Sequence, residues 1–308
     1  MATLALCIPA YNASWCLPKL FSSVEKQSVP FDEVLVYDDC SSDDTVAVAK
    51  AHGATVVSGK VNKGCSFGKN QLAQHAKSEW LFFLDSDDEL LPDFSTNVHK
   101  VIGANHLDAD MIVLSYIYVD GSTDQVKDAP VLDEQLLRQN SFRFMVTQKF
   151  FNSFVVRRNK FLSIGGFDTD PLVLYNEDRA CAVKTALNGF RYEFIKYPCM
   201  KKNFFPESMS SKQPVKWITA SVCLWQKIGN QVQEQYKPDV CDALFTEAIW
   251  AGKYNEWALV RNALKIAKEL KTDALPSASK PFLFLFKTWP LGAYFFREYL
   301  FRVLKRGQ

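Results

Sequence analysis

The sequence of 308 residues lacks a strong excess of charge of either sign and lacks long apolar runs. Lys and Arg number 36 against 34 Asp and Glu, so the formal net charge is only +2 and the large positive charge typical of nucleic-acid-binding proteins is missing. No window of about 18 uninterrupted apolar residues occurs, and a membrane-spanning helix needs one. We therefore expect neither a nucleic-acid partner nor a segment that crosses a bilayer.

Cysteine and histidine are present without the spacings of metal sites. The eight cysteines contain no Cys-x-x-Cys pair, and a chain of this size does not need disulfide bonds for stability. The four histidines share no ligand spacing, so we interpret them as surface or packing residues. Residues 1–18 carry no charge, but Pro9, Asn12 and Pro18 interrupt the apolar segment, unlike a signal peptide. We expect a cytoplasmic protein with reduced thiols.

Apolar runs of strand length alternate with helical patterns through the first half of the sequence. The runs at 4–9, 34–39 and 80–85 are separated by segments with apolar residues at helical spacing. The third run is continuous, which is typical of a strand buried on both faces. The alternation predicts an α/β domain with a mostly parallel sheet, helices on both faces and a ligand site at the carboxyl ends of the strands.

From about residue 212 onward the pattern is helical only. The segment 242–270 is typical of two antiparallel helices joined by a short turn. Proline, serine and alanine then mark a linker. We divide the chain into a sheet domain at 1–211, an all-helical extension at 212–274, and a linker with aromatic and basic helices at 275–308.

Acidic residues gather where the predicted strands end. Asp38 and Asp39 follow the second strand, and Asp85 and Asp87 follow the continuous apolar run. When two carboxylates lie close together, their repulsion raises the pKa of one of them by roughly one unit or more unless a cation is present. A hard divalent metal with oxygen ligands would relieve that repulsion. A solvated acidic loop explains either cluster alone, whereas two clusters at neighbouring strand ends favour a site for a metal and a polyphosphate.

Three further motifs follow in the sequence. Gly64 at a helix start permits close approach of a phosphate, and Lys69 supplies positive charge nearby. The motif Gly-Gly-Phe-Asp stands at 165–168. Glu177 and Asp178 open a helix, where acidic residues are also favoured by the helix dipole alone.

The order of these motifs resembles the inverting glycosyltransferases of family 2, of the bacterial type that makes polysaccharides or lipid-linked glycans. The resemblance covers residues 3 to about 211 and implies the GT-A fold, a Rossmann-like sheet flanked by helices. It implies an Asp-x-Asp motif with a Mg²⁺ or Mn²⁺ on Asp87, and Asp178 as the general base. The donor-binding residues that the motifs and the resemblance indicate are Pro9, Tyr11, Asn12, Asp39, Gly64, Lys69 and Asp85.

Three positions depart from the family pattern. Cys40 stands where Gly is usual, Lys69 replaces an Arg near the diphosphate, and Phe205 stands where many relatives carry a His. The segment 203–211 otherwise resembles the loop that covers the donor. The contact of that His with a metal or diphosphate is therefore absent.

The resemblance implies transfer of a hexose or hexosamine from a nucleotide sugar, expected to be UDP-linked, to a hydroxyl of a glycan or lipid-linked acceptor. The expected mechanism is a metal-assisted single displacement with inversion. A nucleotidyltransferase would need a basic, Gly-rich loop after the first strand, where this sequence has Pro-Ala-Tyr-Asn. A non-catalytic nucleotide-sugar-binding or scaffold protein is the other alternative, and altered acidic motifs would have favoured it.

The C-terminal stretch 281–308 is rich in aromatic and basic residues. Five basic side chains accompany a single acidic one, Glu298. Pro290 and Gly292 favour two helices rather than one. We expect this stretch to associate peripherally with the anionic inner face of a membrane, close to a lipid-linked acceptor. Packing of its apolar residues on the rest of the protein explains the pattern equally well.

Overall fold

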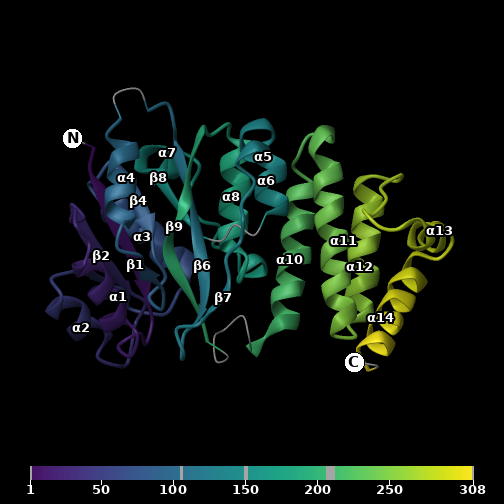
Figure 1. Ribbon diagram of the computed structural model, residues 1–308, viewed down its shortest axis with the longest axis horizontal. Helices are drawn as coiled ribbons and strands as arrows, with labels where there is room; N and C mark the ends of the chain where they lie inside the picture. Colours follow the sequence, from purple (N-terminus) through teal and green to yellow (C-terminus); the bar gives the residue numbers. More distant parts are fainter. Residues whose placement is uncertain (1, 105–106, 149–151, 206–211, 307–308) are drawn as a thin grey trace. The chain divides into compact units, whose positions relative to one another are not determined.

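The computed structural model describes residues 2–104, 107–148, 152–205 and 212–306, and Figure 1 gives its element labels. The chain divides into two compact units. The first, the sheet unit, comprises Met1–Ser141, Gln148–Thr169 and Glu177–Ser208. The second, the helical unit, comprises Phe142–Thr147, Asp170–Asn176 and Met209–Gln308. The predicted division into three functional parts stays a prediction.

Nine strands of the described part of the sheet unit form a single sheet. They are β1 (Leu4–Ala10), β2 (Glu33–Asp38), β3 (Thr55–Ser58), β4 (Trp80–Phe83), β5 (Glu89–Leu90), β6 (Met111–Asp120), β7 (Val126–Asp128), β8 (Phe154–Arg157) and β9 (Tyr192–Phe204). Their order is β3-β2-β1-β4-β8-β6-β9-β5, with β7 paired to β6.

The α/β class with helices on both faces is confirmed, but the sheet is mixed rather than mostly parallel. The strands β3, β2, β1 and β4 are parallel neighbours, and β6 runs parallel to β9. The short strand β8 lies between β4 and β6 and runs antiparallel to both. The short strand β5 pairs antiparallel with β9, and β7 pairs antiparallel with β6. An antiparallel neighbour needs no crossover helix, so the alternating pattern of the first 85 residues does not extend through the whole sheet.

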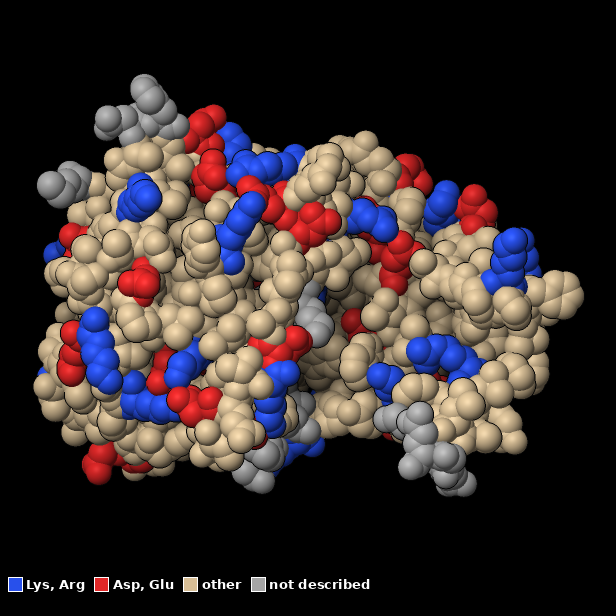
Figure 2. Space-filling model, viewed as in Figure 1, with Lys and Arg blue, Asp and Glu red and all other residues tan. Residues whose placement is uncertain are grey.

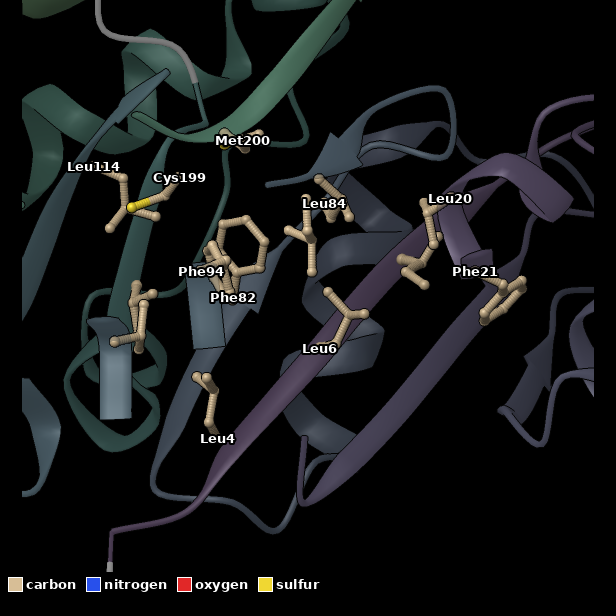
Figure 3. Close-up of a cluster of buried hydrophobic side chains, with 14 of the residues drawn as sticks. Leu4, Leu6, Leu20, Phe21, Phe82, Leu84, Phe94, Leu114, Cys199 and Met200 are labelled. Atoms are coloured by element: carbon tan, nitrogen blue, oxygen red, sulfur yellow. The ribbon is translucent and has the colours of Figure 1, made fainter. Parts of the chain in front are cut away.

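Seven helices belong to the described part of the sheet unit: α1 (Leu17–Glu25), α2 (Thr45–Ala51), α3 (Cys65–His75), α4 (Phe94–Ile102), α5 (Glu134–Gln139), α7 (Arg158–Ser163) and α8 (Glu177–Leu187). Because side chains alternate along a strand, Leu4 and Leu6 of β1 face one side of the sheet. Figure 3 shows them gathered with Phe82, Phe94 and Leu20 in a buried cluster. This cluster fixes α1 and α4 on one face.

The opposite face carries α3 and α7. Gly68 of α3 lies so close to Tyr37 of β2 that an added Cβ would come within 2.7 Å of the ring. The ring of Phe161 in α7 lies 5.2 Å from that of Phe83 in β4. Close packing of α3 on β2 places Lys69, the next residue along, beside the strand ends.

The helical unit contains, in its described part, α6 (Ser141–Thr147), η1 (Pro171–Val173), α10 (Pro214–Gly229), η2 (Glu234–Tyr236), α11 (Lys237–Lys253), α12 (Trp257–Leu270), α13 (Lys280–Thr288) and α14 (Pro290–Arg306). The expected helix pair at 242–270 is confirmed by α11 and α12, which pack side by side (Figure 1). The expected division near Pro290 is confirmed by α13 and α14. None of the described helices has the length and apolar character needed to cross a membrane.

Candidate active site

The loops that follow β1 and β2 are joined at the carboxyl edge of the sheet. Asn12 donates its backbone N–H to Ser41 Oγ at 2.9 Å, and its side-chain oxygen accepts the N–H of Ser42 at 2.9 Å. Pro9 lies inside β1 and is buried, whereas the Tyr11 side chain is 53% exposed. Of these three predicted residues, Tyr11 presents the most surface to a ligand and Asn12 holds the two loops together.

Asp39 and Gly64 form one unit. The buried carboxylate of Asp39 accepts the backbone N–H groups of Lys63, at 2.8 Å, and of Gly64, at 2.7 Å. These amides lie at the N-terminus of α3, where a negative charge is stabilised. Gly64 has φ 87°, a conformation that favours glycine. In this structure the Gly64 amide therefore fixes Asp39 and is not turned toward a phosphate.

The left-handed backbone of Cys40 explains why glycine is usual at its position. Cys40 has φ 66°, which is strained for a residue with a Cβ. We expect Cys40→Gly to raise the free energy of unfolding by about 0.5–1 kcal/mol, after allowing for the flexibility that glycine adds to the unfolded chain. Urea denaturation measures this change.

The control is Cys40→Ala, which removes the sulfur but keeps the Cβ and hence the strain. An alanine variant that gained as much stability as the glycine variant would show that the thiol, not the backbone, is the unfavourable group.

Lys69 joins the two acidic motifs. Its side chain is fully buried, and its Nζ lies 3.1 Å from Asp85 Oδ1, 3.2 Å from Asp178 Oδ1 and 3.8 Å from Glu177 Oε1. Burial alone would lower the pKa of Lys69, but Asp178 and Asp85 raise it well above its usual value. The ammonium is therefore charged and shared among three carboxylates. The sequence predicted that Lys69 lies near a diphosphate and did not predict these partners.

The Gly-Gly-Phe-Asp motif places the Phe167 ring against the ammonium group of Lys69. The Phe167 ring centroid lies 5.0 Å from Lys69 Nζ. Asn70 accepts the Phe167 N–H at 2.8 Å and donates to its carbonyl at 2.9 Å. Gly166 has φ 62°, and a Cβ there would collide with the Asn70 side chain. Gly166 is thus needed for the contact between Asn70 and Phe167 that holds Phe167 in place.

Asp85 and Asp87 differ in their electrostatic surroundings. Asp85 also accepts a hydrogen bond from Asn152 Nδ2 at 3.3 Å. Burial favours a raised pKa for Asp85, but Lys69 and then Lys202 outweigh burial and lower it. Burial and then the charge of Asp85 raise the pKa of Asp87 to about 6. Of these two carboxylates, Asp87 is thus the one that a nearby cation would stabilise more.

A second buried lysine was missed by sequence reasoning. Lys202 of β9 is buried, and its Nζ lies 3.4 Å from Asp88 Oδ2. Asp88 also accepts the backbone N–H of Asn203 at 2.9 Å, yet burial raises the pKa of Asp88 to about 8. Two adjacent lysines in a strand point to opposite faces, so Lys201–Lys202 was a weak signal that one is buried. Asn152 lies in none of the motifs, so nothing in the sequence indicated its contact with Asp85.

The described acidic residues fit a metal only in partnership with a ligand. Within the ranges that the structure describes, no three His, Cys, Asp or Glu side chains are grouped to share a metal ion. Mg²⁺ is commonly held by one or two carboxylates together with substrate phosphates and water. Burial and then the charge of Asp85 raise the pKa of Asp87, and such a cation would favour its ionised form. Asp87, with Asp85 beside it, therefore fits a metal shared with a diphosphate.

Phe205 is a packing residue. Its ring lies 5.1 Å from that of Trp15 in an edge-to-face arrangement, and Gly121 leaves room for it. A phenyl ring has no atom that ligates a metal. The rest of the predicted donor-covering loop, at 206–211, lies outside the described residues.

Acidic groups gather at the carboxyl ends of β2 and β4 of this mixed sheet, and the arrangement is that of the GT-A class of α/β fold. Residues 5–166, more than half of the chain, match the family model described as glycosyl transferase family 2, and the chain belongs to that family. The resemblance carried by the motif order is thereby confirmed.

Three comparisons illustrate the relationship. An "Uncharacterized glycosyltransferase" of Haemophilus influenzae is 28% identical over 176 residues, which cover 54% of this chain and 56% of the relative, so the chain spans about half of that relative's length. TarS 1-349 of S. aureus, in complex with UDP-GlcNAc, aligns over 99% of this chain and 92% of its own with a TM-score of 0.74 and 19% identity. The mannosyltransferase PcManGT of Pyrobaculum calidifontis, with GDP-Man and Mn²⁺, covers 88% of this chain and 87% of its own at a TM-score of 0.58 and 16% identity. At these identities the solved structures establish the fold.

Proposed function

We propose that this chain is an inverting glycosyltransferase that moves a hexose or hexosamine from a UDP-sugar to a hydroxyl of a glycan or lipid-linked acceptor. The observation that carries the proposal is the Lys69 cluster, which brings the Asp-x-Asp motif and Asp178 together at the strand ends of a family 2 fold. The complex of TarS with UDP-GlcNAc supports a UDP-sugar, and the complex of PcManGT with Mn²⁺ supports a divalent metal.

Four of the predicted site residues have distinct parts in this proposal. Asp39, held by the α3 amides, keeps acceptor capacity for the N–H of a nucleobase because each carboxylate oxygen has two lone pairs. The exposed ring of Tyr11 lies beside the base, and Asp85 binds the ribose. Asp87 holds Mg²⁺ or Mn²⁺ together with the diphosphate. When bound, the metal neutralises charge on the leaving diphosphate.

Asp178 is the proposed general base. A single displacement with inversion needs a carboxylate that accepts the proton of the acceptor hydroxyl as that oxygen attacks the sugar. Lys69 binds Oδ1 of Asp178 and so restricts the orientation of the carboxylate. The same ammonium binds Asp85, so the base and the donor-binding motif keep a fixed spacing.

A thermal-shift titration with UDP, GDP and Mn²⁺ tests the proposal. A ligand that binds only the folded state adds about 2.7 kcal/mol of stability at a hundred times its Kd. We expect UDP with Mn²⁺ to stabilise the protein more than UDP alone or GDP with Mn²⁺. A non-catalytic scaffold would show no metal-dependent stabilisation by any nucleotide, and that result would remove the proposal.

Asp87→Asn is expected to weaken the binding of UDP in the presence of Mn²⁺ by roughly tenfold or more, because a neutral amide replaces a charged ligand on a hard cation. Isothermal titration of UDP into both proteins, with and without Mn²⁺, measures the loss. Asp93→Asn is the matched control, because Asp93 is exposed and its substitution changes the net charge by the same amount. Equal metal-dependent affinity in Asp87→Asn and the unmodified protein would exclude Asp87 as the metal ligand.

A further inference from the structure

The last two helices of the helical unit expose an unusual set of apolar side chains. Phe284 of α13 is 76% exposed and Leu304 of α14 is 72% exposed. We define the C-terminal aromatic surface as these exposed side chains: Phe284, Trp289, Phe295, Phe296, Tyr299, Leu300, Val303 and Leu304. Figure 2 shows the α13–α14 end of the helical unit as a largely tan surface with blue side chains around it. A surface with so many exposed apolar residues marks an interaction site.

Helix α14 buries a carboxylate and exposes a stripe of apolar side chains. Its buried residues include Glu298, which is 3% exposed and accepts a hydrogen bond from Arg297 Nη1 at 2.6 Å. Its exposed stripe, at helical spacing, consists of Phe296, Tyr299, Leu300, Val303 and Leu304. A helix that only packed on its own protein would bury such a stripe and expose the carboxylate. The exposed stripe therefore needs an apolar environment from outside the chain.

A cationic cavity lies beside this surface within the same unit. It has a volume of about 690 Å³, and its walls include Phe286, Trp289 and Leu291 as well as four basic residues. The basic residues are Arg261, Lys265, Lys268 and Lys287. Apolar walls with a cationic rim fit a molecule that has an apolar chain and an anionic head.

Most of these cations are uncompensated. Lys265 lies 3.6 Å from Glu269, whereas Arg261, Lys268 and Lys287 have no ion-pair partner among the described residues. Asp273 also lines the cavity, but it is paired with Lys271 at 3.0 Å. The free positive charge beside an apolar stripe is the combination found in helices that lie in a membrane interface.

We propose that the C-terminal aromatic surface and the cationic cavity bind the anionic phospholipid surface of a bilayer. The stripe of α14 lies in the interface, and lipid phosphates lie against Arg261, Lys268 and Lys287. This lipid site goes beyond the proposed transfer reaction, and it brings the protein to a surface on which a lipid-linked acceptor resides. Charged residues within α14 favour a position in the interface over insertion across the bilayer.

Vesicle sedimentation with the full chain tests this proposal. The probes are vesicles of phosphatidylcholine alone and of phosphatidylcholine mixed with phosphatidylglycerol. We expect stronger binding to the mixed vesicles, and this difference should shrink as salt is raised because salt screens the attraction. Equal recovery in the supernatant with and without mixed vesicles at low salt would overturn the proposal.

Two variants separate the apolar and the cationic contributions. The triple change Phe296→Ser, Tyr299→Ser and Leu300→Ser should lower the partition coefficient on both vesicle types by about a hundredfold or more. The triple change Arg261→Gln, Lys268→Gln and Lys287→Gln should lower it by about a hundredfold on mixed vesicles only, since each cation contributes about fivefold. All six side chains are at the surface or on the cavity rim, so folding is preserved.

The matched control removes exposed apolar side chains elsewhere, at Val131, Leu172 and Tyr197, by the same change to serine. It should bind mixed vesicles as the unmodified protein does, and an equal loss would show a non-specific effect. Light scattering without vesicles adds a second readout. If the stripe variant converts an oligomer to a monomer and the unmodified protein ignores vesicles, the surface is an interface between copies and the lipid proposal is wrong. UDP binding should be the same in all variants, so failure here leaves the proposed function intact.

Discussion

Asp178→Asn is expected to reduce sugar transfer by at least about a hundredfold while leaving donor affinity nearly unchanged, because general-base catalysis contributes about 10²–10⁴ to such reactions. Asparagine keeps the shape of the side chain and removes its ability to accept a proton. The measurement is kcat for transfer, with the Kd for UDP and Mn²⁺ determined on the same preparation. A loss confined to kcat assigns Asp178 to the chemical step.

Glu177 is the neighbouring carboxylate and provides the control. Its Oε1 lies 3.8 Å from Lys69 Nζ, and burial, reinforced by the charge of Asp178, raises the pKa of Glu177 to about 7. Glu177→Gln should cost much less than Asp178→Asn. If Asp178→Asn kept most of its kcat and Glu177→Gln lost a hundredfold, the base would be Glu177.

Of the substitutions proposed here, Lys69→Met is expected to lower the free energy of unfolding most, by about 3–5 kcal/mol. Methionine fills a similar volume but leaves Asp85, Asp178 and Glu177 without the buried cation that they share. Removing one partner of a buried ion pair leaves uncompensated charge in a place where water cannot solvate it. Urea denaturation at neutral pH measures the difference.

Lys69→Arg is the matched control, because it keeps the positive charge and restores the residue that is usual in the family. We expect it to retain most of the stability that methionine loses. If the methionine variant unfolded at the same urea concentration as the unmodified protein, the carboxylates would not depend on Lys69, and the link between the two acidic motifs would be refuted.

The sequence predicted the edge of the sheet at which the site lies, and the reason is geometric. Asp39 and Asp85 each follow a strand of the parallel part, and parallel strands bring their carboxyl ends to one edge. Any correct assignment of those strands therefore brings the two motifs close together. The family resemblance added an order of motifs that single patterns do not contain.

The partners of Lys69 were not predictable in the same way. Lys69 and Asp178 are 109 residues apart, and nothing in the local sequence of either encodes their contact. Asn152 lies just before β8, which runs antiparallel to its neighbours, and Lys202 lies in β9, which pairs with β6. The alternating pattern of the first 85 residues predicts neither of these positions.

The C-terminal helices show a different limit of sequence reasoning. A stretch that is apolar around most of its circumference is compatible with packing on the protein and with an external partner. The structure contains both: Phe286 and Tyr294 are buried, while Phe284 and Phe296 are exposed. Only the tertiary arrangement separates the two groups.

The measurement that tests the central claim most directly is nucleotide release from a panel of nucleotide sugars by the unmodified protein and by Asp87→Asn, with and without Mn²⁺. Without acceptor, water takes the place of the acceptor hydroxyl, so slow donor hydrolysis reports the same site. We predict release of UDP from at least one UDP-sugar, dependent on Mn²⁺ and strongly reduced in Asp87→Asn. No nucleotide release from any donor, together with no Mn²⁺-dependent binding of UDP, would contradict the account and favour a non-catalytic protein.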